Sequence, residues 1–420
     1  MGSTIIEKLL ARGARAEAVK PGDITVVEVD MTVLIDLQFG HDRLHDVIKV
    51  DDPDRLAVIL DHAVPAPTIR DAQSGGMARA FAKRHHVSRL FDVGDHGIVH
   101  QVVAEQGLAL PGQNLACTDS HTCAAGALNV AARGLGPAEV LQIVCSGKTW
   151  HLVPPTIKYE LVGSKDPVIN GKDIFLHIAG TYGEATDHAV EYGGPGLASL
   201  PMSDRRTIAT QGAEIGADFS LFPADGLCIE MIDAVAPGAE YEPCLADDDA
   251  SYEQIHQIDL GAIEPMVGRP GTVIDNAVPV SELAGTRIDQ AFVGSCANGQ
   301  LADLETAARM IRGHRVAPGV RMIVTPASQR VYLEAVKAGY VATLIEAGAV
   351  VTNSTCGACF GYHMGVVGPG EVCITASTRN FKGRMGSAEA QIYMASPATV
   401  VASAIAGTIV DQREVDEVVV

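Results

Sequence analysis

The sequence predicts a layered α/β fold, and three observations favour it. Hydrophobic residues make up 47% of the 420 residues and charged residues 20%, a composition typical of a globular chain with buried cores. Short apolar runs of strand type alternate with Ala-rich runs of helix type along the chain. The 43 glycines and 21 prolines are spread along it, which indicates many tight turns between short elements.

Each element is predicted from its local pattern. A short amphipathic helix is predicted within residues 1–23. Strands are predicted at 153–164, where a Pro-Pro break occurs, and at 288–294. Buried strands are predicted for the apolar runs ITVVEVD (24–30), RLAVILD (55–61), RMIVTP (321–326) and EVCITA (371–376). Helices are predicted for the Ala-rich runs at 75–86, 136–147 and 396–407.

Two changes of pattern suggest domain boundaries. A new strand follows the Pro-Pro break near residue 153, and a polar stretch at 246–254 leads into a further Gly- and Pro-containing segment. A length of 420 residues corresponds to two or three domains of ordinary size. We therefore expect three α/β units, at 1–152, 153–268 and 269–420.

The net charge of −20 makes a basic face for nucleic acid or an anionic membrane improbable. An anionic substrate would have to be held by a few local arginines or by a metal. The sequence contains no run of about 18 apolar residues and no secretory signal at its start, so we expect no membrane span and a cytoplasmic protein.

The cysteines fall into two groups. Their number is odd, nine, and a disulfide framework is not expected in such a chain. Six lie among apolar or small residues and are expected to be small buried side chains: Cys117, Cys123, Cys145, Cys228, Cys244 and Cys373.

The other three cysteines, Cys296, Cys356 and Cys359, lie in loops rich in Gly, Ser and Asn. Their spacing is compatible with an iron–sulfur cluster held by three thiolates. It is also compatible with a zinc site completed by His363, or with a redox or structural pair.

Three segments join carboxylates to histidines at predicted strand ends or loops: Asp61-His62, GDHGIVHQ with His100, and Asp119-Ser120-His121. A single such pair is more often structural than catalytic. Three within sixty residues favour a site that moves protons, because a carboxylate orients an imidazole and its pKa lies near neutral pH.

Arg379 and Arg384 lie in a loop after the predicted strand 371–376. They could be ordinary surface arginines. In a chain this acidic they could also form a carboxylate clamp, because a guanidinium makes two parallel hydrogen bonds to a carboxylate.

Taken in order, these segments resemble the aconitase superfamily of iron–sulfur hydro-lyases, and most closely the branch of 3-isopropylmalate dehydratase and homoaconitase large subunits. The segments are DHAVPA, GIVHQ, TDSHT, EYGGPG, GAEIGA, GSCANG, TCGACFG, RNFKGRMG and SPATVVASAIAG. They run from residue 61 to 407, almost the whole chain. The resemblance implies three α/β/α units with the cluster and active site at their junction. It also implies that the family's swivelling fourth domain is absent.

The resemblance also assigns roles. It implies a [4Fe–4S] cluster on Cys296, Cys356 and Cys359, with a fourth iron that binds the substrate's hydroxyl and one carboxylate. It implies three pairs, in which Asp61 orients His62, the acid for the departing hydroxyl, His100 pairs with Asp119, and His121 pairs with Glu214. Substrate would be bound by Ser120, Arg379 and Arg384.

The implied activity is the dehydration and rehydration of a hydroxy-dicarboxylic acid, most simply the isomerisation of 2- and 3-isopropylmalate in leucine biosynthesis. Homoaconitate, a methylmalate or a dimethylmalate are alternatives. The catalytic base would come from a small subunit in a heterodimer or heterotetramer. A zinc-stabilised binding module and an RNA-binding iron sensor are alternatives from other classes, the second opposed by the acidic charge.

Three departures from the family pattern leave the substrate open. The segment VDMTVLIDLQF lacks the His-Asp pair that the dehydratases commonly have there. Thr210 and Thr378 stand where relatives have Asn residues that flank the cluster. Threonine is shorter than asparagine but still donates a hydrogen bond.

Overall fold

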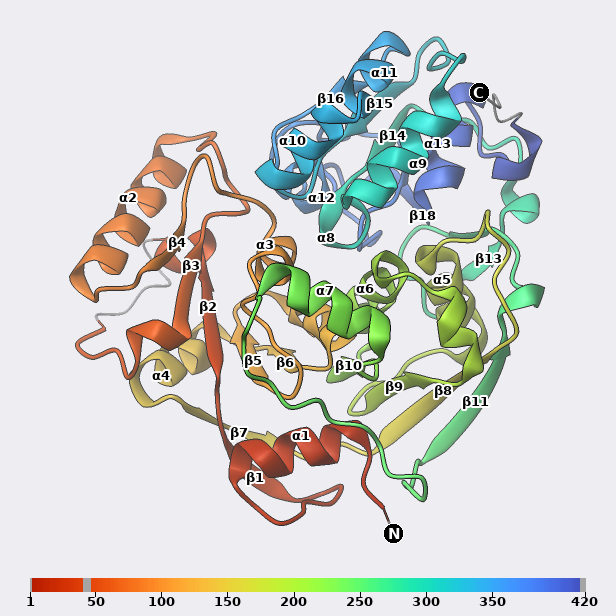
Figure 1. Ribbon diagram of the computed structural model, residues 1–420. Helices are drawn as coiled ribbons and strands as arrows, with labels where there is room; N and C mark the ends of the chain where they lie inside the picture. The colour runs from red at the N-terminus through yellow and green to blue at the C-terminus, as the bar shows by residue number, and fades with distance from the viewer. Residues whose placement is uncertain (1, 41–46, 416–420) are drawn as a thin grey trace. The chain divides into compact units, whose positions relative to one another are not determined.

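The computed structural model describes residues 2–40 and 47–415 (Figure 1). The chain forms two units, each of which packs mainly against itself. Unit 1 comprises Met1–Gly163 and Ala185–Ile258, and unit 2 comprises Ser164–Glu184 and Asp259–Val420. The second unit therefore takes a segment of about one helix from the middle of the first unit's sequence. The expected three-part division stays a prediction.

The main sheet of unit 1 has five parallel strands in the order β4-β3-β2-β5-β6. The strands are β2 (Met31–Ile35), β3 (Leu56–Ile59), β4 (Arg89–Phe91), β5 (Asn114–Cys117) and β6 (Ala131–Gly134). The chain forms the central strand β2 first, then β3 and β4 on one side of it, and then β5 and β6 on the other side. The carboxyl ends of β2 and β5 therefore lie at the point where the winding reverses, which is where ligands bind in open α/β sheets.

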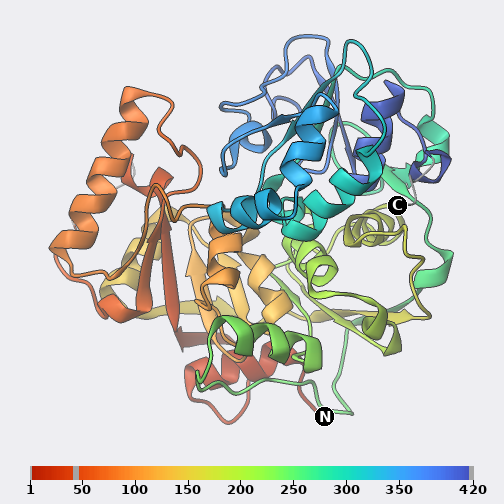
Figure 2. The ribbon, with the colours of Figure 1, turned by 45° about the horizontal axis from the view of Figure 1, so that its top comes forward.

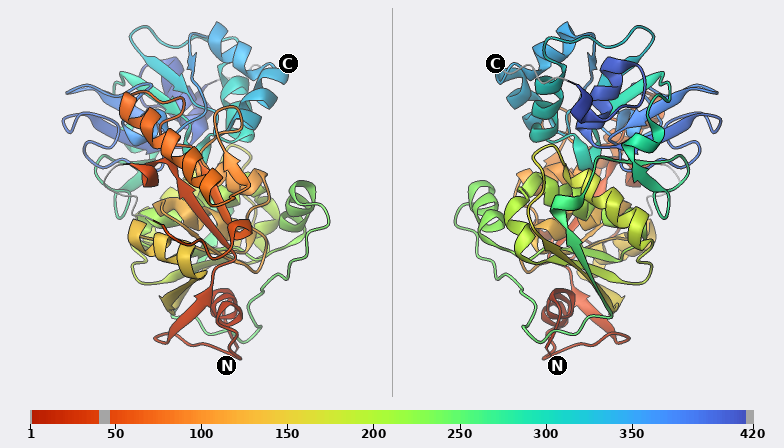
Figure 3. Two further views of the ribbon diagram at one scale, coloured as in Figure 1. Left: turned by 90° about the vertical axis from the view of Figure 1, so that its left-hand side faces the viewer. Right: turned by 90° about the vertical axis from the view of Figure 1, so that its right-hand side faces the viewer.

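Helices cover both faces of this sheet, because alternate strand residues point to opposite sides. On one face, Leu34 and Val58 pack against α2 (Ile69–Arg84) and α4 (Pro137–Ser146). In the left view of Figure 3, α2 lies in front of these strands. On the other face, Val33 and Ile59 pack against α3 (Val99–Glu105), η3 (Ser120–Leu128) and α7 (Gly226–Val235) (Figure 2). Each fully buried apolar side chain contributes about 1.5–3 kcal/mol.

Unit 1 contains a second sheet and a ribbon. The four-stranded sheet has the order β10-β9-β8-β11, with β8 (Thr156–Val162), β9 (Ala189–Gly193), β10 (Phe219–Leu221) and β11 (Gln254–Asp259). Beside it run η4 (Pro195–Ser199), α6 (Met202–Gln211) and η5 (Gly212–Ile215). The antiparallel ribbon joins β1 (Ile24–Glu28) to β7 (Lys148–Leu152).

The prediction that residues 24–30 form a buried strand is wrong in one respect. The strand exists, but Ile24 is 73% exposed and Val26 59% exposed. In the two-stranded ribbon only one face is covered, where Val27 packs against α1 (Ile5–Ala14). The other face has no layer over it within the described residues of unit 1, so alternate apolar residues stay in solvent.

Unit 2 is built on a seven-stranded mixed sheet in the order β13-β12-β18-β17-β14-β15-β16. The five strands from β18 to β16 are parallel, and β12 pairs antiparallel with β18 and β13. The strands are β12 (Met266–Gly268), β13 (Ala277–Pro279), β14 (Gln290–Val293), β15 (Arg321–Val324), β16 (Val350–Val351), β17 (Val372–Thr375) and β18 (Gln391–Ala395).

Helices and loops cover opposite faces of this sheet. One face packs against α9 (Leu301–Ile311), α10 (Gln329–Lys337), α11 (Tyr340–Glu346) and α13 (Pro397–Ala406) (Figure 1). On the other face, Phe292 and Ile392 pack against residues of the two loops that flank β17, including Val367 and Met385. The short helices α8 (Ser295–Asn298) and α12 (Gly357–Phe360) and the helix α5 (Gly171–Tyr182) complete the unit.

The other predicted elements are confirmed: the strands appear as β3, β8, β14, β15 and β17, and the helices as α1, α2, α4 and α13. Five of the six cysteines expected to be buried are buried, and Cys145 is half-buried. Among residues 2–40 and 47–415, no helix combines the length and the apolarity that a membrane crossing requires.

Gly126 is a position where the fold of unit 1 admits only glycine. A Cβ atom there would lie 1.9 Å from the carbonyl oxygen of Ser220, because η3 and β10 meet backbone to backbone. We expect Gly126→Ala to lower the free energy of unfolding by about 2–3 kcal/mol or more, as overpacking does. Urea denaturation followed by circular dichroism measures this.

Gly76, in the middle of α2, is the matched control, because a Cβ there meets no atom within 4 Å. Gly76→Ala should stabilise the chain by about 0.5–1 kcal/mol through helix propensity. Equal effects of the two substitutions would contradict the close approach of η3 and β10.

Candidate active site

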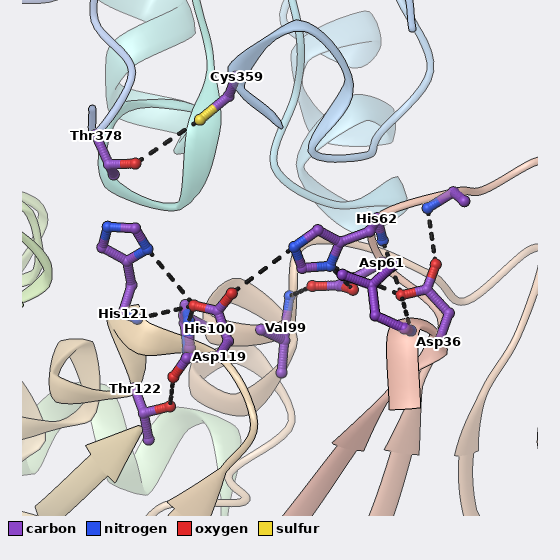
Figure 4. Close-up of polar contacts among 12 residues, drawn as sticks. Asp36, Asp61, His62, Val99, His100, Asp119, His121, Thr122, Cys359 and Thr378 are labelled. Carbon is purple, nitrogen blue, oxygen red and sulfur yellow. Dashed lines mark hydrogen bonds and ion pairs between the residues drawn. The ribbon is translucent and has the colours of Figure 1, made fainter. Parts of the chain in front are cut away.

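Carboxylates and imidazoles gather at the carboxyl edge of the five-stranded sheet of unit 1 (Figure 4). Asp36 directly follows β2, Asp61 and His62 follow β3 after one residue, and Asp119 and His121 follow β5. Because these strands are parallel, their carboxyl ends lie at one edge and bring the side chains together. His100 joins them from the first turn of α3.

Asp119 is the centre of this group. Its Oδ1 lies 2.7 Å from Nε2 of His100 and accepts the backbone N–H of His121 at 2.8 Å. The same oxygen is 3.5 Å from Nδ1 of His121, and Oδ2 is 3.7 Å from Nε2 of His62. One carboxylate therefore faces three buried imidazoles.

His62 is oriented from its other side by two carboxylates. Its Nδ1 is hydrogen-bonded to Oδ1 of Asp61 and lies 3.7 Å from Oδ1 of Asp36. Asp36 accepts the backbone N–H groups of His62 at 3.2 Å and of Ala63 at 2.8 Å. Oδ2 of Asp61 accepts the N–H of Val99 at 3.2 Å, which ties the start of α3 to this loop. With Nδ1 bound to Asp61, the imidazole presents Nε2 to the centre of the group.

His121 bonds to a carboxylate from another part of unit 1. Its Nε2 lies 2.9 Å from Oε1 of Glu214, which sits in η5 directly after α6. The contact between η3 and α6 is among the most extensive in unit 1, and it includes a hydrogen bond from the thiol of Cys123 to the carbonyl of Thr210 at 3.5 Å. All three carboxylate–histidine pairs implied by the resemblance are thus in hydrogen-bond contact, whereas their catalytic roles stay predictions.

Burial and pairing shift the pKa values in opposite directions. Burial alone would raise the pKa of Asp119, but hydrogen bonds from His100 and His121 outweigh it and hold the pKa well below its usual value. Burial lowers the pKa of His100 despite Asp119. For His121, hydrogen bonds to Asp119 and Glu214 overcome burial and raise the pKa. Burial raises the pKa of Asp61 to about 7, with His62 opposing and Asp36 adding to the shift.

Asp36 is a site residue that sequence reasoning misses, because the surrounding segment lacks the expected His-Asp pair. The available signal is its position, since a carboxylate that directly follows an apolar strand is placed at the ligand-binding edge of a parallel sheet. Ser120, by contrast, is exposed between Asp119 and His121.

In unit 2, the three candidate cysteines also lie at the carboxyl edge of parallel strands. Cys296 follows β14 within α8, and Cys356 and Cys359 follow β16, two strands away in the same sheet. Cys296 and Cys359 are buried, and Cys356 is half-buried. The loop after β17, on the other side of β14, brings Thr378 to the same edge, with its hydroxyl 3.7 Å from Sγ of Cys359 (Figure 4).

The backbone around these thiols is shaped by unusual conformations. Ser295, directly before Cys296, has φ of 90°, which side-chain-bearing residues rarely adopt and which costs about 1–3 kcal/mol. Gly361 has φ of 70°, and a Cβ there would lie 2.3 Å from the carbonyl oxygen of Arg384. Such strain is typical of segments held for function rather than for stability.

The donor set fits an iron–sulfur cluster. Three soft sulfur ligands at one sheet edge are the ligands such clusters take. The hydroxyl of Ser354, two residues before Cys356, is fully buried and has no hydrogen-bond partner among the described residues. An unsatisfied buried hydroxyl costs free energy and suits a hydrogen bond to a cluster sulfur.

The remaining candidate residues are half-buried or bonded elsewhere. Arg379 and Arg384 are half-buried, and the Arg384 guanidinium carbon lies 5.7 Å from the ring centre of Phe360 and 5.8 Å from that of Phe381. Cation–π contact of this kind fixes a guanidinium without neutralising it. The hydroxyl of Thr210 donates to the carbonyl of Arg206 at 2.6 Å in its own helix, so its proton is already used within α6.

Known proteins resemble this chain over its whole length. A family model described as the aconitase family (aconitate hydratase) matches residues 13–407. A 3-isopropylmalate dehydratase large subunit of Mycolicibacterium smegmatis is 62% identical, covering 99% of this chain and 98% of that protein. A protein of the same name from Lachnoclostridium phytofermentans is 39% identical, covering 99% of each.

Two further likenesses are weaker. A 2,3-dimethylmalate dehydratase large subunit of Eubacterium barkeri is 38% identical, covering 99% of this chain and 100% of that protein. The crystal structure of the aconitase X holo-form of Thermococcus kodakaraensis has a TM-score of 0.49 at 11% identity, covering 87% of this chain and 88% of that one.

The Glu214–His121 pair generates a prediction that needs no cofactor. Removing the Glu214 carboxylate takes away a group that stabilises the charged imidazolium, so Glu214→Gln should lower the pKa of His121. A pH titration of the histidine resonances by NMR measures this. His188, which bonds to Glu253, serves as the internal reference and should titrate unchanged. An unaltered His121 titration would mean that the pair does not set this pKa.

Proposed function

This chain belongs to the aconitase family, and on that premise we propose that it is the large subunit of a hydro-lyase that interconverts 2- and 3-isopropylmalate in leucine biosynthesis. Water is removed to give an alkene and is added back with the hydroxyl on the neighbouring carbon. The observation that carries the proposal is the 62% identity to a 3-isopropylmalate dehydratase large subunit over nearly the full length of both chains.

Family membership implies an iron–sulfur cluster. We propose a [4Fe–4S] cluster held by Cys296, Cys356 and Cys359, supported by their common position at one sheet edge and by the unsatisfied hydroxyl of Ser354. When bound, a cluster with one iron not held by a thiolate supplies a Lewis acid for the substrate's hydroxyl. Thr378 would then lie beside the ligand Cys359.

His62 is the proposed acid for the departing hydroxyl. Hydroxide is a poor leaving group, and a positioned imidazolium that protonates it lowers the barrier. Asp61 and Asp36 hold the Nδ1 side of this ring, so the proton to be transferred is the one on Nε2. After the transfer, the raised pKa of Asp61 helps the pair to be reprotonated near neutral pH.

The proposed acid, His62, faces Asp119, which also contacts His100 and His121. Glu214 in turn bonds to His121. The strongly lowered pKa of Asp119 keeps its carboxylate charged, which keeps the facing imidazoles in fixed orientations. We propose that Ser120, Arg379 and Arg384 bind the substrate's carboxylates. For Arg384, the support is its stacking on Phe360 and Phe381, which fixes the guanidinium in one place.

The partner is proposed from the names of the relatives, which are large subunits. We propose a small subunit that contributes a swivelling domain and the base that removes the C–H proton, in a heterodimer or heterotetramer. Asp119 is not the proposed base, because its carboxylate already faces three imidazoles. The other residues described above serve in this proposal as the acid or orient the acid.

The cluster proposal predicts that each of Cys296→Ser, Cys356→Ser and Cys359→Ser abolishes cluster assembly, because each removes one thiolate ligand. Iron and sulfide per chain after anaerobic reconstitution, together with the visible spectrum, measure this. Cys145→Ser is the control, since Cys145 is half-buried on α4 and should leave iron and sulfide unchanged. Full iron in Cys359→Ser, or zinc in place of iron and sulfide in the wild-type chain, would contradict the proposal.

The activity is tested by co-purifying the chain with the small subunit of its own organism. We expect turnover of isopropylmalate by the pair and little by the cluster-loaded chain alone. One methylene more or fewer changes specificity by about 10–200-fold, so 2,3-dimethylmalate should have a kcat/KM at least tenfold lower. Homoaconitate carries a third carboxylate in place of an apolar group, and its kcat/KM should be lower as well. A higher kcat/KM for 2,3-dimethylmalate than for isopropylmalate would mean that the enzyme is a dimethylmalate dehydratase. Robust turnover by the chain without a small subunit would overturn the proposal that a partner is required.

A further inference from the structure

Lys172 occupies a position that opposes two general rules. It is the second residue of α5, which is capped by Asn170, and its side chain is fully buried within the described chain. Lysine is among the residues least often found fully buried. The amino end of a helix also carries partial positive charge and favours anions over cations. Residues that break such rules are expected where function requires them.

The contacts of Lys172 show what its nitrogen does. Nζ donates to the carbonyl oxygen of Ser377 at 2.9 Å and lies 3.9 Å from the sulfur of Met394. Asp173, its neighbour, is hydrogen-bonded through both oxygens of its carboxylate. Its two oxygens accept the backbone N–H groups of Met266 and Asn170, each at 3.0 Å.

Ser377 belongs to the loop that follows β17 and carries two residues of the proposed site. The next residue, Thr378, is fully buried and contacts Sγ of Cys359 at 3.7 Å. The hydroxyl of Ser377 donates to the carbonyl of Arg379 at 3.3 Å. The nitrogen of Lys172 therefore holds the backbone from which both Thr378 and Arg379 project, and it does so from α5, more than two hundred residues away in sequence.

We propose that Lys172 is a positioning residue, which fixes the Ser377–Arg379 backbone so that Thr378 supports the thiolate of Cys359 and Arg379 meets a substrate carboxylate. This inference rests on the proposed function, because it assigns the loop a role beside the cluster. It adds a residue in α5, outside every segment that carries the family resemblance. Lys172 touches neither substrate nor cluster in this assignment and acts only through Ser377.

The alternative is that Lys172 only fills space in the core of unit 2. Methionine has nearly the same length and volume but no donor, so Lys172→Met separates the two roles. Lys172→Gln keeps a donor, but its side chain is shorter and should not reach Ser377. If the Met variant is insoluble, the Gln variant replaces it in the comparison with the wild type. Lys172→Arg keeps both length and donors and is the rescue variant.

Two measurements report on the loop rather than on overall stability. The first is the rate at which the reconstituted cluster loses its visible absorption in air, compared at equal initial iron and sulfide. The second is KM for isopropylmalate with the small subunit present. We expect Lys172→Met and Lys172→Gln to lose the cluster about tenfold faster and to raise KM about tenfold, as small misplacements of supporting groups do. Lys172→Arg should recover most of both.

Thr399→Val is the control for destabilisation of unit 2. The hydroxyl of Thr399 in α13 donates to Gln412 at 2.6 Å and has no hydrogen bond to the Ser377–Arg379 segment among the described residues, although Gln412 itself bonds to the carbonyl of Val168, ahead of α5. Its loss should lower the Tm without changing the cluster lifetime or KM. If Lys172→Met lowers the Tm and leaves both loop measurements at wild-type values, Lys172 is a structural residue and the inference is overturned.

A double-mutant cycle tests the route through Thr378. If Lys172 acts by placing Thr378, the effects of Lys172→Met and Thr378→Val on cluster lifetime should be strongly non-additive. Additive effects would overturn that route. The wild-type chain separates this inference from the proposed function. A wild type that takes up no iron and sulfide overturns both, whereas a normal wild type with normal Lys172 variants overturns only the inference.

Discussion

The carboxylate of Asp119 is the group on which the arrangement of the three imidazoles in unit 1 depends. A buried charge is tolerated only when it is paired and hydrogen-bonded, and here the partners are three imidazoles and a backbone N–H. Each imidazole comes from a different connection of the sheet, so Asp119 links β3, α3 and η3 at once. Removing it would leave several buried polar groups without their partner, which is more costly than losing one hydrogen bond.

The same geometric rule arranges both units. Parallel strands place their carboxyl ends, and the loops that follow, at one edge of a sheet. In unit 1 this edge collects Asp36, Asp61 and Asp119, and in unit 2 it collects Cys296 and Cys359. The antiparallel ribbon of unit 1 carries none of the candidate residues. The chemistry of this chain is thus distributed according to strand direction.

The two edges differ in how they are held. In unit 1 the side chains support one another through charge-assisted hydrogen bonds, and burial together with these bonds moves their pKa values apart. In unit 2 the thiol loops are held through the backbone. Three features hold these loops: Ser295 has a strained backbone, Gly361 lies close to the carbonyl of Arg384, and the nitrogen of Lys172 donates to the carbonyl of Ser377.

Much of the site can be inferred from the amino-acid sequence, because its chemistry is local. Dipeptides such as Asp61-His62 and the spacing from Cys356 to Cys359 are visible as patterns, and apolar runs and glycines locate the strands and turns that carry them. Individual elements are also predictable, since hydrophobic periodicity follows from backbone geometry alone. The error at residues 24–30 shows the limit of this reasoning. An apolar run predicts a strand, but only its neighbours decide whether that strand is buried.

The sequence by itself determined which residues are candidates for chemistry and which segments form most of the strands and helices, because both depend on residue type and short-range spacing. Only the tertiary structure decided that Asp36 joins His62 and that Lys172 holds a loop two hundred residues away. It also assigned residues 164–184 to the second unit. These facts depend on strand order and on contacts between distant segments. Periodicity and spacing do not encode strand order, because the energy that selects it is shared among many residues of the packed core.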